Sequence, residues 1–136
     1  MKRLKLFITV VGLGVGFMAM GQSTASCDKV YDYVPDMPDY NGSPNAIFGF
    51  IETELNPIIT EAKANGRPIS FTKLVLTINA SNEVSNIEFI DFKGDEMAKK
   101  KLKAKIAAMK NWKSATKEGT PVCCKFFMPF QCVNMD

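Results

Sequence analysis

The chain has 136 residues, 46% of them apolar and 23% charged, which predicts a single globular domain with one core. Its formal net charge of +3 comes from Lys2, Arg3 and Lys5, because without these three of the 17 bases the remaining 14 are balanced by 14 acids. This balance argues against bulk attraction to nucleic acid. The absence of histidine excludes Ser-His and Cys-His catalytic pairs.

Residues 1–21 have the layout of a secretory signal peptide. A short basic region precedes the sixteen-residue apolar run LFITVVGLGVGFMAMG, whereas a spanning helix needs about 20 apolar residues. Small residues at Ala19 and Gly21 predict cleavage before Gln22. We therefore expect an exported, periplasmic protein. It would stay associated with a membrane if the signal is not cleaved or if Cys27 is lipidated.

Export would place the four cysteines where disulfides can form. Three of them fall in one predicted strand near the C-terminus, in which Cys124 and Cys132 would lie about 26 Å apart and Cys123 would point to the opposite face. A bridge within the chain therefore needs Cys27, or else a vicinal link between Cys123 and Cys124. The favoured interpretation is that most of the four cysteines are small core side chains. Without histidine or a Cys-x-x-Cys spacing, we expect no metal site and no cofactor.

Residues 22–36 are predicted to form an extended arm, and residues 37–136 to form the domain. Ser43 is a suitable N-cap for a helix that begins at Pro44. Apolar residues at helical spacing extend this helix to Leu55. The pair Asn56-Pro57 is expected to end it, before a second short helix.

A β-hairpin is predicted next. Residues 69–80 are rich in β-branched side chains and form the first strand, with Leu76 on its buried face. Residues 84–92 form the second, returning strand, with Ile87 and Phe89 together on one face. Between them Ser81-Asn82 supplies the turn, because asparagine tolerates a left-handed backbone.

A lysine-rich helix follows, with Asp95 and Glu96 at its positive end. Its apolar stripe includes Leu102 and Ile106 and is predicted to continue to Trp112, which we expect to be a buried core residue at the end of the helix. The other faces could be a basic surface for phosphates or acidic lipids, or a solvated face. The second is favoured because no aromatic residues interleave with the lysines. These lysines are Lys99, Lys100, Lys101, Lys103, Lys105 and Lys110.

The last predicted strand runs from Val122 to Cys132, with apolar side chains at alternate positions. Pro129 cannot donate to a strand ladder, so this strand should have at least one unpaired side. We therefore expect this strand to have an exposed edge. The predicted structural core comprises Phe50, Leu76, Ile87, Phe89, Leu102, Ile106 and Trp112.

The order of these features resembles the TonB C-terminal domain. The specific pieces are MPDYNG at 37–42, MKNWKSATKEGTPV at 109–122 and FMPF at 127–130, within a match over about Val30 to Cys132. The resemblance implies an α+β fold: a small antiparallel three-stranded sheet, made of the hairpin and the C-terminal strand, with helices packed on one face. It also implies a non-catalytic module that binds an extended peptide by β-strand addition. On this resemblance we predict a peptide-binding edge at Lys125, Phe126, Phe127 and Met128. The implied partner is a segment of a TonB-dependent outer-membrane receptor.

The sequence departs from the family in one functional respect. Energy transduction by full-length TonB needs a long spacer, whereas about ten residues separate the apolar segment from the domain here, a reach of about 35 Å. We therefore expect a stand-alone module and a poor energy transducer. Asn82 also occupies a turn position at which the family usually has glycine. This difference affects only the geometry of the loop.

Two other classes of function stay open. A periplasmic structural protein or lipoprotein could use the same edge to self-associate as a homodimer, with Cys123 or Cys132 as links between copies. A thiol redox enzyme is suggested by the vicinal cysteines, but no activating residue stands near them. We expect no enzymatic activity, a protein or peptide partner, and no nucleic acid.

Overall fold

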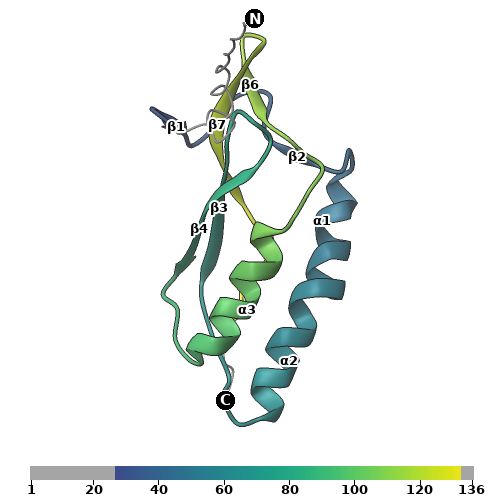
Figure 1. Cartoon of the computed structure of the whole chain (residues 1–136), viewed down its shortest axis with the longest axis vertical. Coiled ribbons are helices and arrows are strands. Elements are labelled where there is room, and N and C mark those ends of the chain that lie inside the picture. The colour runs from purple at the N-terminus through teal and green to yellow at the C-terminus, as the bar shows by residue number, and fades with distance from the viewer. Residues whose placement is uncertain (1–26, 133–136) are drawn as a thin grey trace, which may run out of the picture.

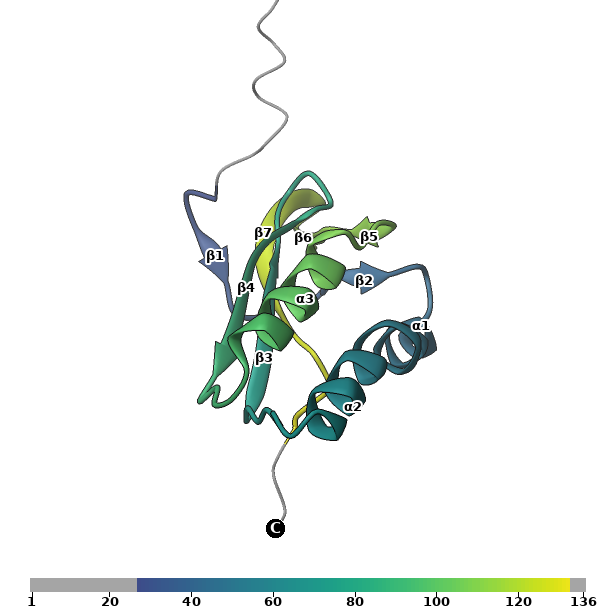
Figure 2. The same cartoon turned by 60° about the horizontal axis from the view of Figure 1, so that its bottom comes forward.

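The computed structural model describes residues 27–132 (Figure 1), and the predicted signal peptide, its cleavage site and the first residues of the predicted arm lie outside them. The described residues form the predicted α+β fold. Helices lie on one side of a sheet (Figure 2). No helix in this part of the chain is long and apolar enough to cross a membrane.

The elements follow one another in short segments. The strands are β1 (Val30–Tyr31), β2 (Asp39–Tyr40), β3 (Lys73–Ile78), β4 (Val84–Ile90), β5 (Trp112–Lys113), β6 (Ala115–Lys117) and β7 (Thr120–Phe127). The helices are α1 (Pro44–Phe50), the π-helical η3 (Ile51–Leu55), α2 (Asn56–Ala64) and α3 (Glu96–Ala107).

The main sheet is built around β7, with which β1, β3 and β6 all pair. β3 is antiparallel to β7 and to β4, so the order across the sheet is β1-β7-β3-β4, and β6 forms a hairpin with β7. β1 is parallel to β7. The sequence predicted three antiparallel strands, and the structure corrects this to five, one of them parallel. The two additional strands have two and three residues, too few for an alternating pattern to be recognised.

The first helical region is continuous over Pro44–Ala64, so the prediction that Asn56-Pro57 would end a helix is wrong. The π-helical η3 comes before α2, and Pro57 falls in the first turn of α2. A proline at this position is tolerated because its missing N–H would have little intrahelical use. The Ser43 cap is as predicted, with its hydroxyl accepting the amide two residues on at 3.2 Å.

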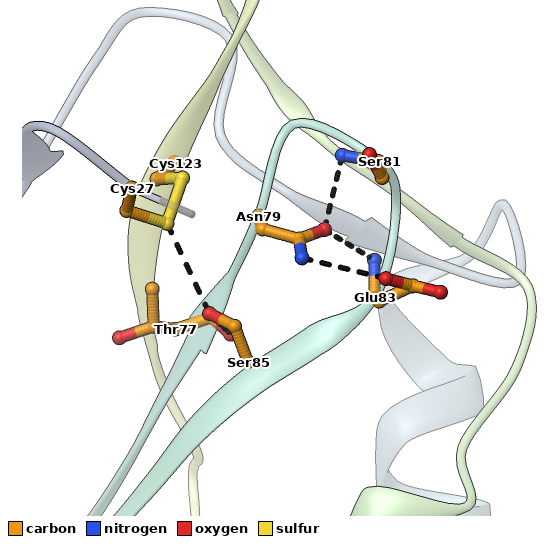
Figure 3. The surroundings of a disulfide bond; sticks show 7 residues. All are labelled: Cys27, Thr77, Asn79, Ser81, Glu83, Ser85 and Cys123. Carbon is orange, nitrogen blue, oxygen red and sulfur yellow. Dashed lines mark hydrogen bonds between the residues drawn. A yellow bond between two sulfur atoms is a disulfide. The ribbon is translucent and has the colours of Figure 1, made fainter. Parts of the chain in front are cut away.

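The predicted hairpin of β3 and β4 is confirmed, with strands shorter than expected. At its tip, the side-chain oxygen of Asn79 accepts the amides of Ser81 and Glu83, both at 3.0 Å (Figure 3). Asn82 has the left-handed backbone predicted for it, at φ 66°. Its side-chain oxygen accepts the amide of Ser114 at 2.7 Å, which ties the tip to the segment before β6.

The main core lies between the sheet and the helices. Several of the predicted core residues are buried there, and the others are partly buried against them. The buried ones are Leu76, Leu102, Ile106 and Trp112, and the partly buried ones are Phe50, Ile87 and Phe89.

Trp112 reaches the core from a different element than predicted. α3 ends at Ala107, and Trp112 lies in β5, paired with Tyr40 of β2. Its ring centre lies 5.2 Å from that of Tyr40 and 5.0 Å from that of Phe126. The helical stripe does not extend to it because Asn111, at φ 68°, has already left the helical conformation. The aromatic cluster therefore joins β2, β5 and β7.

Gly94, just before α3, should be sensitive to substitution. Its φ is +119°, which side chains rarely adopt, and an added Cβ would overlap the carbonyl oxygen of Pro68. We expect Gly94→Ala to lower the free energy of unfolding by about 2 kcal/mol or more. Gly49, in α1, is the control: no atom lies within 4 Å of an added Cβ, so Gly49→Ala should raise stability by about 0.5–1 kcal/mol. Urea denaturation measures both variants, and equal stabilities would contradict this description of Gly94.

Candidate functional site

β7 pairs with β3 along one of its two main-chain edges. In an antiparallel pair, residues whose main-chain groups bond to the partner alternate with residues whose groups face away. The amide of Met128 donates to the carbonyl of Leu74 at 3.0 Å, so the even-numbered residues of this segment face β3. The main-chain groups of Lys125 and Phe127 therefore face the outer side.

The outer side of β7 is only partly covered. β1 pairs there with Cys123 and Cys124, and its register ends at that point. Because the odd-numbered residues of β7 face outward, the parallel bridge between Tyr31 and Cys124 engages the carbonyl of Cys123 and the amide of Lys125. Beyond that amide, no strand in the described part of the chain pairs with this side of β7 as far as Phe127. We call the outer main-chain edge of β7 from the Lys125 carbonyl to Phe127 the open edge. Unpaired N–H and C=O groups of this kind are ready to accept another strand.

The four residues of the predicted peptide-binding edge have two different environments. Phe126 and Met128 direct their main-chain groups toward β3 and their side chains into the core. Lys125 and Phe127 belong to the open edge. The ammonium of Lys125 forms an ion pair with Asp32 at 3.1 Å, directly after β1.

An apolar groove of about 360 Å³ lies beside the open edge, between the end of β7, β2 and the start of α1. The residues that border it include Phe48 and Phe127, which are 53% and 50% exposed. We call this hollow the groove; its lining is Pro38, Asp39, Tyr40, Ser43, Pro44, Ile47, Phe48, Phe126, Phe127 and Pro129. Exposed apolar surface next to unpaired main chain is typical of a peptide-docking site.

Sequence reasoning did not identify Phe48 as part of the site, although a signal was present. The apolar stripe of the first helix runs through Ile47, Phe50, Ile51 and Leu55, and Phe48 falls outside it. A large aromatic residue off the buried stripe is expected to face solvent. Only the topology of the fold reveals that Phe48 lies beside β7.

A disulfide joins Cys27 to Cys123, with 5.9 Å between their Cα atoms (Figure 3). Three residues separate Cys27 from Tyr31, which pairs in parallel with Cys124. The bond therefore holds the start of β1 against β7. It lies over the side of the hairpin that carries Thr77 and Ser85, and the Ser85 hydroxyl is 4.0 Å from the Cys27 sulfur.

The remaining two cysteines are free thiols inside the fold. Burial raises the pKa of the Cys124 thiol, against the smaller opposing effect of a hydrogen bond with the main chain of Lys125. Burial likewise raises the pKa of Cys132 more than the charge of Lys63 lowers it. A raised pKa depletes the nucleophilic thiolate at neutral pH. This chemistry is unfavourable for a thiol enzyme.

The lysine-rich face of α3 is partly engaged in ion pairs with the first helical region. Lys101 lies 3.7 Å from Glu61, and Lys105 lies 3.0 Å from Glu54. Such exposed pairs are typical of a solvated helix face. Residues 27–132 contain no cluster of three or more Cys, Asp or Glu side chains that could hold a metal ion.

Comparison with known proteins assigns no family. No protein-family model matches the sequence, no curated protein matches it, and no solved structure matches its fold. The likeness to the TonB C-terminal domain therefore rests on the residues of the chain alone.

The raised pKa values predict slow alkylation of Cys124 and Cys132. At pH 7 we expect iodoacetamide to modify both thiols at least about tenfold more slowly in the folded protein than in urea, because the reactive thiolate is depleted and buried. The rate in the folded state should rise only above the ordinary thiol pKa of about 8.5. Mass spectrometry of the modified peptides measures each site. Rapid modification of either thiol in the native protein at pH 7 would contradict the expectation.

Proposed function

We propose that this chain is a non-catalytic binding module that captures an extended peptide by β-strand addition at the open edge. The observation that supports this most directly is the unpaired outer side of β7 from the Lys125 carbonyl to Phe127. In strand addition, main-chain hydrogen bonds supply affinity and alternate side chains supply selectivity. The open edge offers main-chain hydrogen bonds, and the groove offers contacts for alternate side chains.

The groove gives the docked strand a preferred chemistry. The side chains of a docked peptide would alternate between the two faces of the sheet. The peptide residue opposite Phe127 would point away from the helices, as Phe127 does, and its two neighbours would point toward them. That is the side on which Tyr40, Ile47 and Phe48 line the groove. One lining residue, Asp39, carries a charge. A bulky apolar residue therefore fits this position of the peptide best.

The resemblance to the TonB C-terminal domain supplies the class of partner. On this proposal the peptide is an extended segment of an outer-membrane receptor, and the module acts in TonB-dependent transport from the periplasm. The order MPDYNG, MKNWKSATKEGTPV and FMPF supports it, together with the position of the last piece at the end of β7.

Self-association through the same edge is the competing proposal, and one observation weakens it. Cys123, which was one candidate for a link between copies, is bonded to Cys27 of its own chain. Cys132 is partly buried and its sulfur lies 3.2 Å from the carbonyl of Ile69. Light scattering of the purified protein distinguishes a monomer with a free open edge from a dimer that uses it.

Phe127→Pro tests the main-chain part of the proposal. The Phe127 amide faces away from β3, so proline removes an outer donor without removing a bond to β3. Against a peptide of about eight residues selected from a random library, we expect binding to weaken at least about tenfold. Phe127→Ala is the matched control: it keeps the amide and should lose less. Isothermal calorimetry gives the affinities and thermal unfolding confirms the fold. Equal affinities for wild type and Phe127→Pro would exclude the open edge as the binding site.

Phe48→Ser tests the groove. Because Phe48 is half exposed, the substitution should leave the fold intact while removing apolar area from the groove, at a cost of about 1–2 kcal/mol of binding. This loss should appear only with a peptide that carries leucine at the position facing α1, and not with its alanine analogue. Met97→Ser, at an equally exposed position in α3 outside the groove, is the control and should change neither affinity. A Phe48→Ser variant that binds both peptides like wild type would refute the role of the groove.

A further inference from the structure

The outer side of β7 already holds one added strand, and it comes from the same chain. β1 pairs Val30 with Cys123 and Tyr31 with Cys124 in parallel register. These positions adjoin the open edge without a gap, because the next residue of β7 is Lys125. A peptide docked on the open edge and β1 therefore lie in line along one side of one strand.

The contacts that hold β1 are few: Tyr31 packs against the small buried cluster of Val34, Ala115 and Cys124, and the others lie at the surface. Its ladder has two residues, and Val30 is 37% exposed. The Tyr31 ring lies between two ammonium groups, 4.6 Å from that of Lys29 and 5.0 Å from that of Lys117. Exposed contacts of this kind contribute little. The chain is anchored in the fold again only at Val34, which is buried with Ala115 and Cys124.

The Cys27–Cys123 disulfide is thus the strongest attachment of this segment. It links the start of the segment covalently to the β7 residue at which the ladder begins. Cys27 is partly exposed whereas Cys123 is buried, so an external thiol can reach the Cys27 sulfur more readily. A covalent tether keeps a weakly held strand in place by raising its effective concentration.

We propose that β1 is an intramolecular occupant of the docking side of β7, locked by the Cys27–Cys123 disulfide, and that reduction of this bond releases β1 and lengthens the edge open to a partner strand. The proposal rests on the proposed function of the open edge. Release would add the outer main-chain groups of Cys123 and the amide of Lys125 to the open edge, which would then run from residue 123 to residue 127. Val34 would keep the rest of the chain in place.

The reductant is a dithiol, either dithiothreitol or a reduced Cys-x-x-Cys protein. One of its thiolates attacks the Cys27 sulfur, which forms a mixed disulfide and expels Cys123 as a thiolate that takes up a proton. The second thiol of the reductant then attacks the mixed disulfide and releases Cys27. The protein gains two thiols, and the dithiol is oxidised to its disulfide.

The test compares three proteins with the library-selected peptide: oxidised wild type, wild type treated with dithiothreitol, and Cys27→Ser. Each main-chain hydrogen bond gained corresponds to about a factor of 2 to 10 in affinity, so reduced wild type and Cys27→Ser should bind about tenfold more tightly than oxidised wild type. Dithiothreitol should not change the affinity of Cys27→Ser. Ser85→Ala, which alters the neighbouring hydroxyl and keeps the disulfide, should behave like wild type in both states.

A second measurement follows β1 without any peptide. Hydrogen exchange at the Tyr31 amide, which the parallel register turns toward β7, should accelerate at least about tenfold on reduction, while exchange in β3 stays unchanged. Unchanged protection of the Tyr31 amide after reduction would overturn the proposal that the disulfide locks β1 in place. Equal or weaker peptide binding after reduction would overturn it as well. Neither result would contradict the proposed function of the open edge. A protein that binds no peptide in either state contradicts the proposed function itself.

Discussion

The two-residue period of β7 is the constraint on which the rest of this structure depends. Its even-numbered residues bond to β3 through the main chain and place Cys124, Phe126 and Met128 on the side of the helices. Its odd-numbered residues turn both main chain and side chain the other way. One alternation therefore assigns the core, the disulfide at Cys123 and the outward position of Phe127. A shift of the register by one residue would exchange all of these roles at once.

Local sequence patterns were sufficient to predict the elements that are long enough to show a repeated spacing of apolar residues. The alternation in β3 and β4, the left-handed Asn82 between them and the stripe of Leu102 and Ile106 all predicted elements that the structure contains. The short strands β1, β2, β5 and β6 could not be predicted, because two or three residues carry no period. Pro57 was misleading for a related reason: the sequence shows that a proline is present, but not that a π-helical turn will place it at the start of α2.

The candidate site was predictable in part. The prediction that Pro129 lies within the last strand is wrong, because β7 ends at Phe127. Strand geometry restricted a bridge within the chain to Cys27 or to a vicinal pair. The choice of Cys123 depends on β1 lying parallel to β7, which brings together two cysteines 96 positions apart in the sequence. The groove depends in the same way on α1 approaching β7, so that Phe48 and Phe127 become neighbours only after folding.

The position of the Cys27–Cys123 bond also determines how the domain would carry mechanical load. The bond encloses nearly all of the described chain in one covalent ring, from Cys27, three positions before β1, to the middle of β7. Tension applied at Cys27 would therefore reach β7 directly, without first peeling β1 away. Against an opposing pull at Cys132, the load would pass along the covalent chain from Cys123 through the end of β7, so neither the ring nor the ladder between β7 and β3 would lie in its path.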